Sequence, residues 1–116
     1  TGWPWTTMTD LADRTLVQGQ PVLNEAEIHQ QLAALPDWSL ATQAEVPRIE
    51  LAYRFPDFAK ALAFVNLVGA LAEEQNHHPA LLLEWGKVTV SWWSHDAGGV
   101  HLNDLIMAAR TERLYR

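Results

Sequence analysis

The 116-residue sequence contains no cysteine, which excludes disulfides, thiolate metal sites and a cysteine nucleophile. It also lacks a long apolar run: even its longest runs, such as Ala61–Val65, are far shorter than the roughly 20 residues that span a bilayer. The N-terminus shows no charged-then-apolar leader. We therefore expect a cytoplasmic protein with no membrane partner.

Basic residues are few in this chain. Eight Lys and Arg stand against 14 Asp and Glu, so the net charge is -6 and no basic stripe is present to neutralise phosphates. Direct nucleic-acid binding is therefore not expected. The composition is otherwise that of a folded protein, with 48% hydrophobic and 19% charged residues, and the length suits one core.

The first 23 residues show neither helical nor strand periodicity. Because they mix Gly, Pro, Thr and Asp with isolated apolar residues, we expect an extended or partly ordered arm over residues 1–23. Trp3 and Trp5 either anchor this arm onto the body of the protein or belong to a remnant added to the natural chain. Residues 24–116 are predicted to form the folded domain.

Seven elements are predicted within this domain. In chain order they are a helix over 25–35, strands around 38–40 and 49–55, a helix from about 57 to 75, strands over 81–85 and 87–93, and a helix over 102–114. The order α-β-β-α-β-β-α favours an α+β fold, a four-stranded antiparallel sheet with three helices packed on one face. Trp92 and Trp93 must point to opposite faces of the last strand, so one is predicted in the core and the other outside it.

Histidines and carboxylates concentrate between residues 73 and 104. His77 and His78 follow the predicted long helix, His95 ends the last strand, and Asp104 lies in the first turn of the last helix. Strand ends and helix starts can bring such groups to one rim. Imidazole, with an ordinary pKa of roughly 6.5, exchanges protons near neutrality, and a neighbouring carboxylate fixes its tautomer. We therefore predict a proton-transfer site, with Asp104 orienting an imidazole.

Other interpretations of these histidines stay open. Adjacent histidines after a helix are more often a solvated cap than a catalytic pair. A metal site could draw on four imidazoles, those of His77, His78, His95 and His101. It is less favoured, because adjacent residues rarely aim at one ion and no His-Glu-x-x-His motif is present. A Ser94-based triad is weaker still, since the Gly-x-Ser-x-Gly elbow is missing. His29 is expected on the exposed side of the first helix.

The same region resembles the signature of a known family. In order, the matching motifs are Glu73–Pro79, Trp85–Val88, Trp93–His95, Gly98-Gly99 and Asn103-Asp104. Together they are similar to the pterin-4a-carbinolamine dehydratases, and in particular to the bacterial members associated with phenylalanine hydroxylase. The resemblance covers roughly residues 24–114.

This resemblance implies a homodimer or homotetramer with no metal and no organic cofactor. It implies a dehydratase that removes water from 4a-hydroxytetrahydropterin to give quinonoid dihydropterin, in tetrahydrobiopterin recycling for aromatic amino acid hydroxylation. Its catalytic set would be His77 and His95 as acid/base groups, His78 mainly binding the pterin, and Asp104 orienting an imidazole. Three further residues would line the pocket with polar contacts, namely Glu73, Asn76 and Ser94.

The resemblance also carries an alternative function. Some relatives have lost dehydratase activity and serve as protein partners, as a dimerisation cofactor of a homeodomain transcription factor or as an assembly factor for a carbon-fixing enzyme. A non-catalytic role with a protein partner is therefore the second hypothesis, and the N-terminal arm could carry its contacts. Leu81 and Leu82 stand where animal members often have an aromatic residue.

Overall fold

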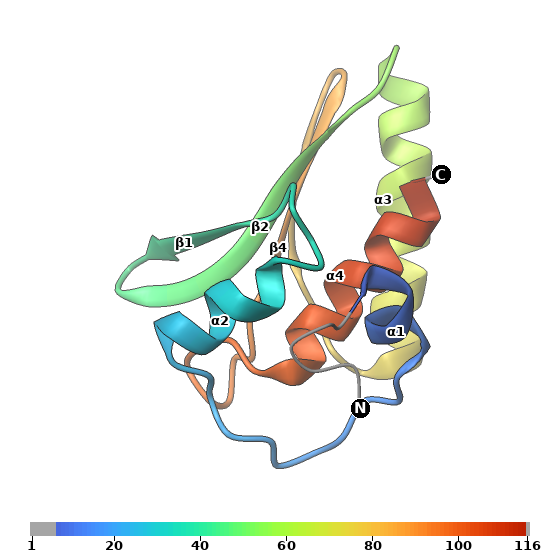
Figure 1. Ribbon diagram of the computed structural model, residues 1–116. Coiled ribbons are helices and arrows are strands. Elements are labelled where there is room, and N and C mark those ends of the chain that lie inside the picture. The colour runs from blue at the N-terminus through green and yellow to red at the C-terminus, as the bar shows by residue number, and fades with distance from the viewer. Residues whose placement is uncertain (1–6, 116) are drawn as a thin grey trace.

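A four-stranded antiparallel sheet and the helices beside it make up this computed structural model, which describes residues 7–115 (Figure 1). The elements are α1 (Met8–Asp13), α2 (Glu25–Leu32), β1 (Ser39–Gln43), β2 (Val46–Arg54), α3 (Phe58–Gln75), β3 (Ala80–Glu84), β4 (Lys87–Trp92) and α4 (Leu102–Tyr115). The predicted α+β class and the predicted order from α2 to α4 are confirmed. Trp3 and Trp5 lie outside the described residues.

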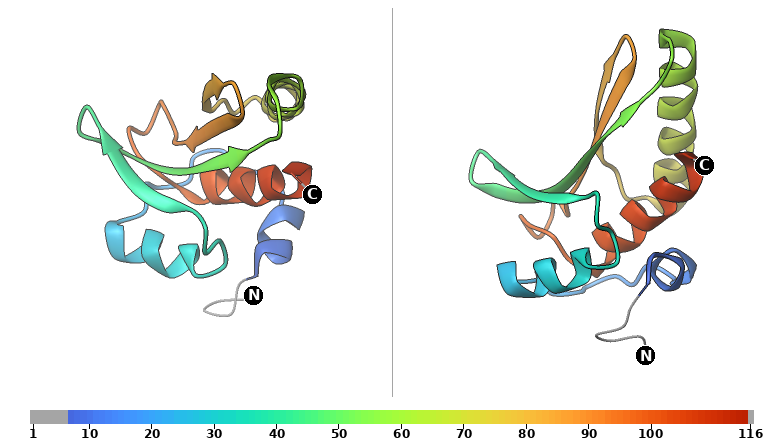
Figure 2. Two further views of the ribbon diagram at one scale, coloured as in Figure 1. Left: turned by 90° about the horizontal axis from the view of Figure 1, so that it is seen from above. Right: turned by 45° about the horizontal axis from the view of Figure 1, so that its top comes forward.

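The strands lie in the order β1-β2-β4-β3, and every pairing is antiparallel. Helix α2 contacts β1, α3 contacts β3 and β4, and α4 contacts β2 and β4. The views in Figure 2 show the sheet strongly curved, with these helices gathered on one side of it. The curvature follows from the right-handed twist of the strands.

Alternation along the strands explains which face is covered. Val88, Val90 and Trp92 are fully buried on the helix side of β4, and Ile49 is fully buried on β2. Trp93 follows on the opposite face and is half-buried. The prediction that the two tryptophans face opposite ways is therefore confirmed, and Trp92 is the one in the core.

Two tight turns connect the strand pairs. The β1–β2 turn consists of Ala44 and Glu45, both with positive φ (52° and 65°), so the two strands extend further toward each other than the predicted 38–40 and 49–55. In the β3–β4 turn, a Cβ at Gly86 would lie 2.8 Å from the carbonyl oxygen of Phe55. Only glycine fits that close backbone approach.

The predicted start of α2 is confirmed and its predicted end is not. The Asn24 side chain accepts from the Glu27 N–H and the Glu27 side chain accepts from the Asn24 N–H, which together form a capping box. The helix ends at Leu32 rather than Leu35, because residues 33–35 continue in tighter turns with hydrogen bonds three residues apart.

Residues 7–23 fold against the body of the protein. They contain α1, which periodicity did not indicate because a six-residue helix offers fewer than two turns to detect. Leu11 and Ala12 of α1 are buried, and the Arg110 guanidinium donates to the carbonyls of Ala12 and Arg14 at 3.1 and 2.7 Å. The part of the arm that the structure describes is therefore docked on α4.

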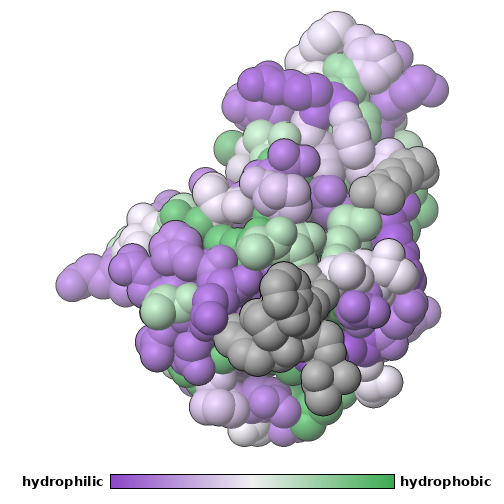
Figure 3. Space-filling view, in the orientation of Figure 1, coloured by the Kyte–Doolittle hydropathy of each residue, from purple (hydrophilic) through white to green (hydrophobic). Residues whose placement is uncertain are grey.

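The surface of the molecule mixes polar and apolar residues. In Figure 3 hydrophilic residues dominate the two ends of the visible face, and a band of hydrophobic residues crosses its middle. Within the described range, no helix is both long and apolar enough to cross a membrane.

Candidate active site

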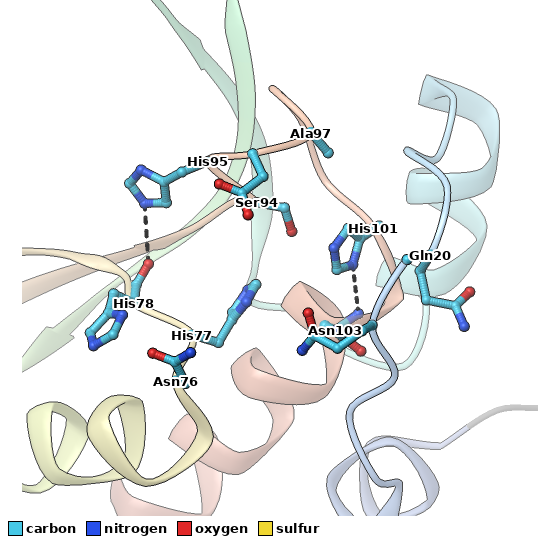
Figure 4. Close-up of a pocket in the computed structure, with 12 residues that line it drawn as sticks. Gln20, Asn76, His77, His78, Ser94, His95, Ala97, His101 and Asn103 are labelled. Carbon is cyan, nitrogen blue, oxygen red and sulfur yellow. Dashed lines mark hydrogen bonds between the residues drawn. The ribbon is translucent and has the colours of Figure 1, made fainter.

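A cavity of about 660 Å³ opens where three chain segments meet (Figure 4). The first segment is residues 18–20 of the arm, the second is residues 76–78 after α3, and the third runs from the end of β4 to the start of α4. Figure 4 shows His78 and His95 on one side of His77, and His101 with Asn103 on the other. The histidines that are distant in sequence therefore meet at one site.

The end of α3 sets the direction of His77. Asn76 adopts the left-handed conformation (φ 51°), which asparagine tolerates better than most residues, and the His77 N–H donates to the Ala72 carbonyl at 3.1 Å. This cap ends the helix before Pro79 is reached. The chain then turns, so that the His77 ring lines the cavity and stacks near Trp92 at 5.8 Å between ring centroids.

Asp104 is not part of the cavity lining but anchors three residues that are. Its side chain is completely buried and accepts three hydrogen bonds: from His77 Nε2 at 2.6 Å, from the Ser94 hydroxyl at 2.7 Å and from the His101 backbone N–H at 3.0 Å. These donors compensate for the burial of a carboxylate. Because Nε2 of His77 donates to Asp104, the lone pair of the neutral ring lies on Nδ1.

His95 is held at the opposite rim by a stack of side chains. Its ring lies on Trp93 with centroids 4.4 Å apart, and the Arg48 guanidinium carbon sits 3.8 Å from the centre of the Trp93 ring. The His95 Nε2 lies 3.3 Å from the His78 carbonyl oxygen, to which it donates. The neutral His95 ring therefore also carries its lone pair on Nδ1.

Three of the other predicted site residues line the cavity and one does not. His78, Asn76 and Ser94 belong to the lining. The His78 side chain is half exposed and pairs with Glu73, whose own side chain is 79% exposed. Glu73 lies outside the lining, and its side chain reaches the site through His78.

His101 and Asn103 line the cavity and were not assigned a substrate role from the sequence. His101 precedes α4, and its Nδ1 accepts from the Asn103 N–H at 3.1 Å. Burial lowers the pKa of His101, His77 acts in the same direction, and the Asp104 carboxylate opposes them. One feature of the sequence could have indicated a role for His101. It lies three residues before Asp104, at the start of the last predicted helix, where a side chain often accepts a backbone hydrogen bond.

The arm supplies the remaining wall. Asn103 binds the backbone of Val17 twice, accepting from its N–H at 3.0 Å and donating to its carbonyl at 2.8 Å. The Leu23 N–H donates to the Val100 carbonyl at 2.8 Å. These contacts join residues that are about eighty positions apart, so sequence patterns do not indicate them.

This arrangement is suited to proton transfer. Two rings, those of His77 and His95, present basic nitrogens, and a buried carboxylate fixes the tautomer of one. Within residues 7–115, no group of three or more His, Asp or Glu side chains is arranged to hold a metal ion. The geometry supports general acid/base chemistry on a small polar molecule.

A family model and two relatives identify the same protein family. A family model described as "Pterin 4 alpha carbinolamine dehydratase" matches residues 21–114. Two relatives carry the name "Putative pterin-4-alpha-carbinolamine dehydratase". The one from Microcystis aeruginosa is 50% identical over 112 residues, which cover 94% of this chain and 97% of that one. The one from Chlorobaculum tepidum is 53% identical over 94 residues, covering 81% and 84%.

Two solved structures are similar in fold. The first is described as a transcriptional coactivator/pterin dehydratase from Brucella melitensis. Its TM-score is 0.73 at 27% identity, and the match covers 82% of this chain and 99% of that one. The second is described as a pterin dehydratase-like protein that is a RuBisCO assembly factor in the alpha-carboxysome. At 22% identity and a TM-score of 0.57, over 68% of this chain and 89% of that one, it shows a shared fold alone.

Proposed function

This chain belongs to the pterin 4 alpha carbinolamine dehydratase family, and from that premise we propose that it is an active dehydratase. Its substrate is 4a-hydroxytetrahydropterin and its product is quinonoid dihydropterin. The cellular role that we propose is the recycling of tetrahydrobiopterin after aromatic amino acid hydroxylation.

The reaction is an elimination of water. The C4a–O bond breaks with its electron pair going to oxygen, an acid protonates that oxygen, and a base removes the proton from N5 so that the N5=C4a double bond forms. One proton donor and one proton acceptor on the two sides of a cavity meet this requirement at neutral pH. His77 and His95 supply such a pair of nitrogens.

The single observation that carries this proposal is the hydrogen bond between His77 and the buried Asp104. Asp104 fixes the tautomer of the His77 ring and stabilises the imidazolium that forms during proton transfer. His78 is proposed to bind the pterin, with Glu73 holding its ring. Asn76 and Ser94 add polar contacts to the wall.

The test is the rate of quinonoid dihydropterin formation from freshly generated 4a-hydroxytetrahydropterin, followed by ultraviolet absorbance. The protein is expected to accelerate the reaction, and His77→Ala and His95→Ala are each expected to lower kcat about 10²-fold or more, the usual scale for general acid/base catalysis.

His29→Ala is the matched control, because His29 lies exposed on α2 outside the cavity lining. It is expected to leave kcat unchanged. Wild-type turnover in both active-site variants would contradict the assignment of His77 and His95. A spontaneous rate in the presence of the folded wild-type protein would instead favour a non-catalytic role with a protein partner.

A further inference from the structure

His101 is a buried imidazole with one nitrogen committed to the fold. Only 8% of the residue is exposed, and it occupies the cap position just before α4. Its Nδ1 accepts a hydrogen bond from the Asn103 backbone N–H at 3.1 Å. A nitrogen that accepts carries no proton, so the neutral ring holds its proton on Nε2.

The Nε2–H group is the part of this ring left for a ligand. Among residues 7–115, this N–H group makes no hydrogen bond, and its nitrogen is not among the atoms sealed from solvent, although His101 as a whole is more than nine-tenths buried and lines the cavity. A donor that opens onto a cavity without a protein partner can bind water there, and the acceptor atom of a ligand can take the place of that water.

His101 also lies beside the proton-transfer residue. Its ring centroid is 5.9 Å from that of His77 with 45° between the planes, and Figure 4 shows it on the side of His77 away from His95. Both residues are tied to Asp104, His77 through its ring and His101 through its backbone N–H. A small group bound against His77 is therefore within reach of His101.

Resting on the proposed dehydratase function, we propose that His101 is a fourth imidazole of the site and donates from Nε2–H to the oxygen that leaves C4a. As that bond breaks, negative charge grows on the oxygen and the hydrogen bond becomes stronger. The proton that completes the water molecule comes from the acid of the His77 and His95 pair. His101 keeps its own proton throughout the step.

Two substitutions separate this donor role from the structural role of His101. Asparagine is a preferred helix cap and can accept from the Asn103 N–H, but it is too short to replace the Nε2–H donor. Glutamine reaches further and can place an amide N–H near the original donor position. We expect His101→Asn to lower kcat about 10- to 100-fold with KM changed less than about twofold. This loss in kcat is at or below the roughly 10²- to 10³-fold loss that removal of one oxyanion donor causes. His101→Gln is expected to recover most of that loss.

The inference is overturned if His101→Asn turns over at the wild-type rate, or if His101→Gln is as slow as His101→Asn. A second measurement does not depend on activity: the ¹⁵N chemical shifts of the wild-type His101 ring at pH 7. We expect a protonated Nε2 and an unprotonated Nδ1, and the reverse tautomer would also overturn the inference. Absence of turnover in the wild-type protein would contradict the proposed function instead, while the ¹⁵N measurement would still test the donor assignment.

Discussion

Asp104 performs two tasks with one carboxylate. It accepts from the His101 N–H at the start of α4, which caps the helix, and it accepts from the His77 ring that lines the cavity. Because Ser94 also donates to it, the carboxylate is fixed from three directions. The site residues are therefore positioned by the same contacts that start the last helix, and fold and site are coupled at this residue.

The lowered pKa of His101 predicts how stability depends on pH. In the unfolded chain this imidazole titrates near its ordinary pKa of about 6.5, whereas burial keeps it neutral to lower pH in the folded protein. Below about pH 6.5 the unfolded state therefore binds more protons at this position, and the free energy of unfolding falls as pH decreases. Urea titrations between pH 5 and 7 should show a smaller decrease for His101→Asn than for the wild type. Equal slopes would contradict the prediction.

At the scale of elements, the docked arm completes the cavity. Helix α1 packs on α4 and buries Leu11, and residues 18–20 then form one wall of the site. Val22 packs so closely on Gly99 that a Cβ there would lie 2.8 Å from a Val22 methyl carbon. The arm therefore adds both core and pocket surface, although residues before 21 lie outside the family match.

Shortening Leu11 tests how firmly the arm is docked. Since this side chain is fully buried, Leu11→Ala is expected to lower the free energy of unfolding by about 2–5 kcal/mol, as for other buried leucines. Asp13→Ala is the control within the same helix. It breaks an exposed ion pair with Arg113 and should cost at most about 1 kcal/mol in the same urea titration. A Leu11→Ala effect as small as that of the control would show that α1 contributes little to the fold.

At the scale of the whole molecule, several of the large apolar side chains that remain exposed lie on α3 and on the β3–β4 hairpin. Phe58, Leu62 and Leu67 of α3 are 41–49% exposed. Leu82 on β3 is 58% exposed and Trp85 in the adjacent turn is 68% exposed. Strand β3 is also at the edge of the sheet. An open edge and exposed large apolar residues are features that association between subunits commonly covers.

We therefore predict a homodimer or homotetramer in solution. Light scattering at micromolar concentration should give two or four times the chain mass of 13.1 kDa. Trp85→Lys and Leu82→Lys should lower that mass if β3 takes part, while an exposed substitution on the opposite side, such as His29→Ala, should leave it unchanged. A mass of 13.1 kDa for the wild type would contradict the prediction.

Local patterns in the sequence determined most of the elements and the identity of the family. Such patterns act over a few residues and can be recognised without a structure. Examples are the alternation along β2 and β4, the capping box at Asn24 and Glu27, and the glycine at position 86. The order of the elements then left few topologies, and the four-stranded antiparallel sheet followed.

Contacts between distant residues were decided only by the tertiary structure. The pairing of His77 with Asp104 spans 27 positions, and the docking of Val17 on Asn103 spans 86. The tautomer of His101 depends on a backbone N–H that α4 turns toward it. The sequence by itself determined which residue types are present and which elements form, because those depend on neighbours along the chain. Which nitrogen of each imidazole faces the cavity depends on packing, and only the folded structure decided it.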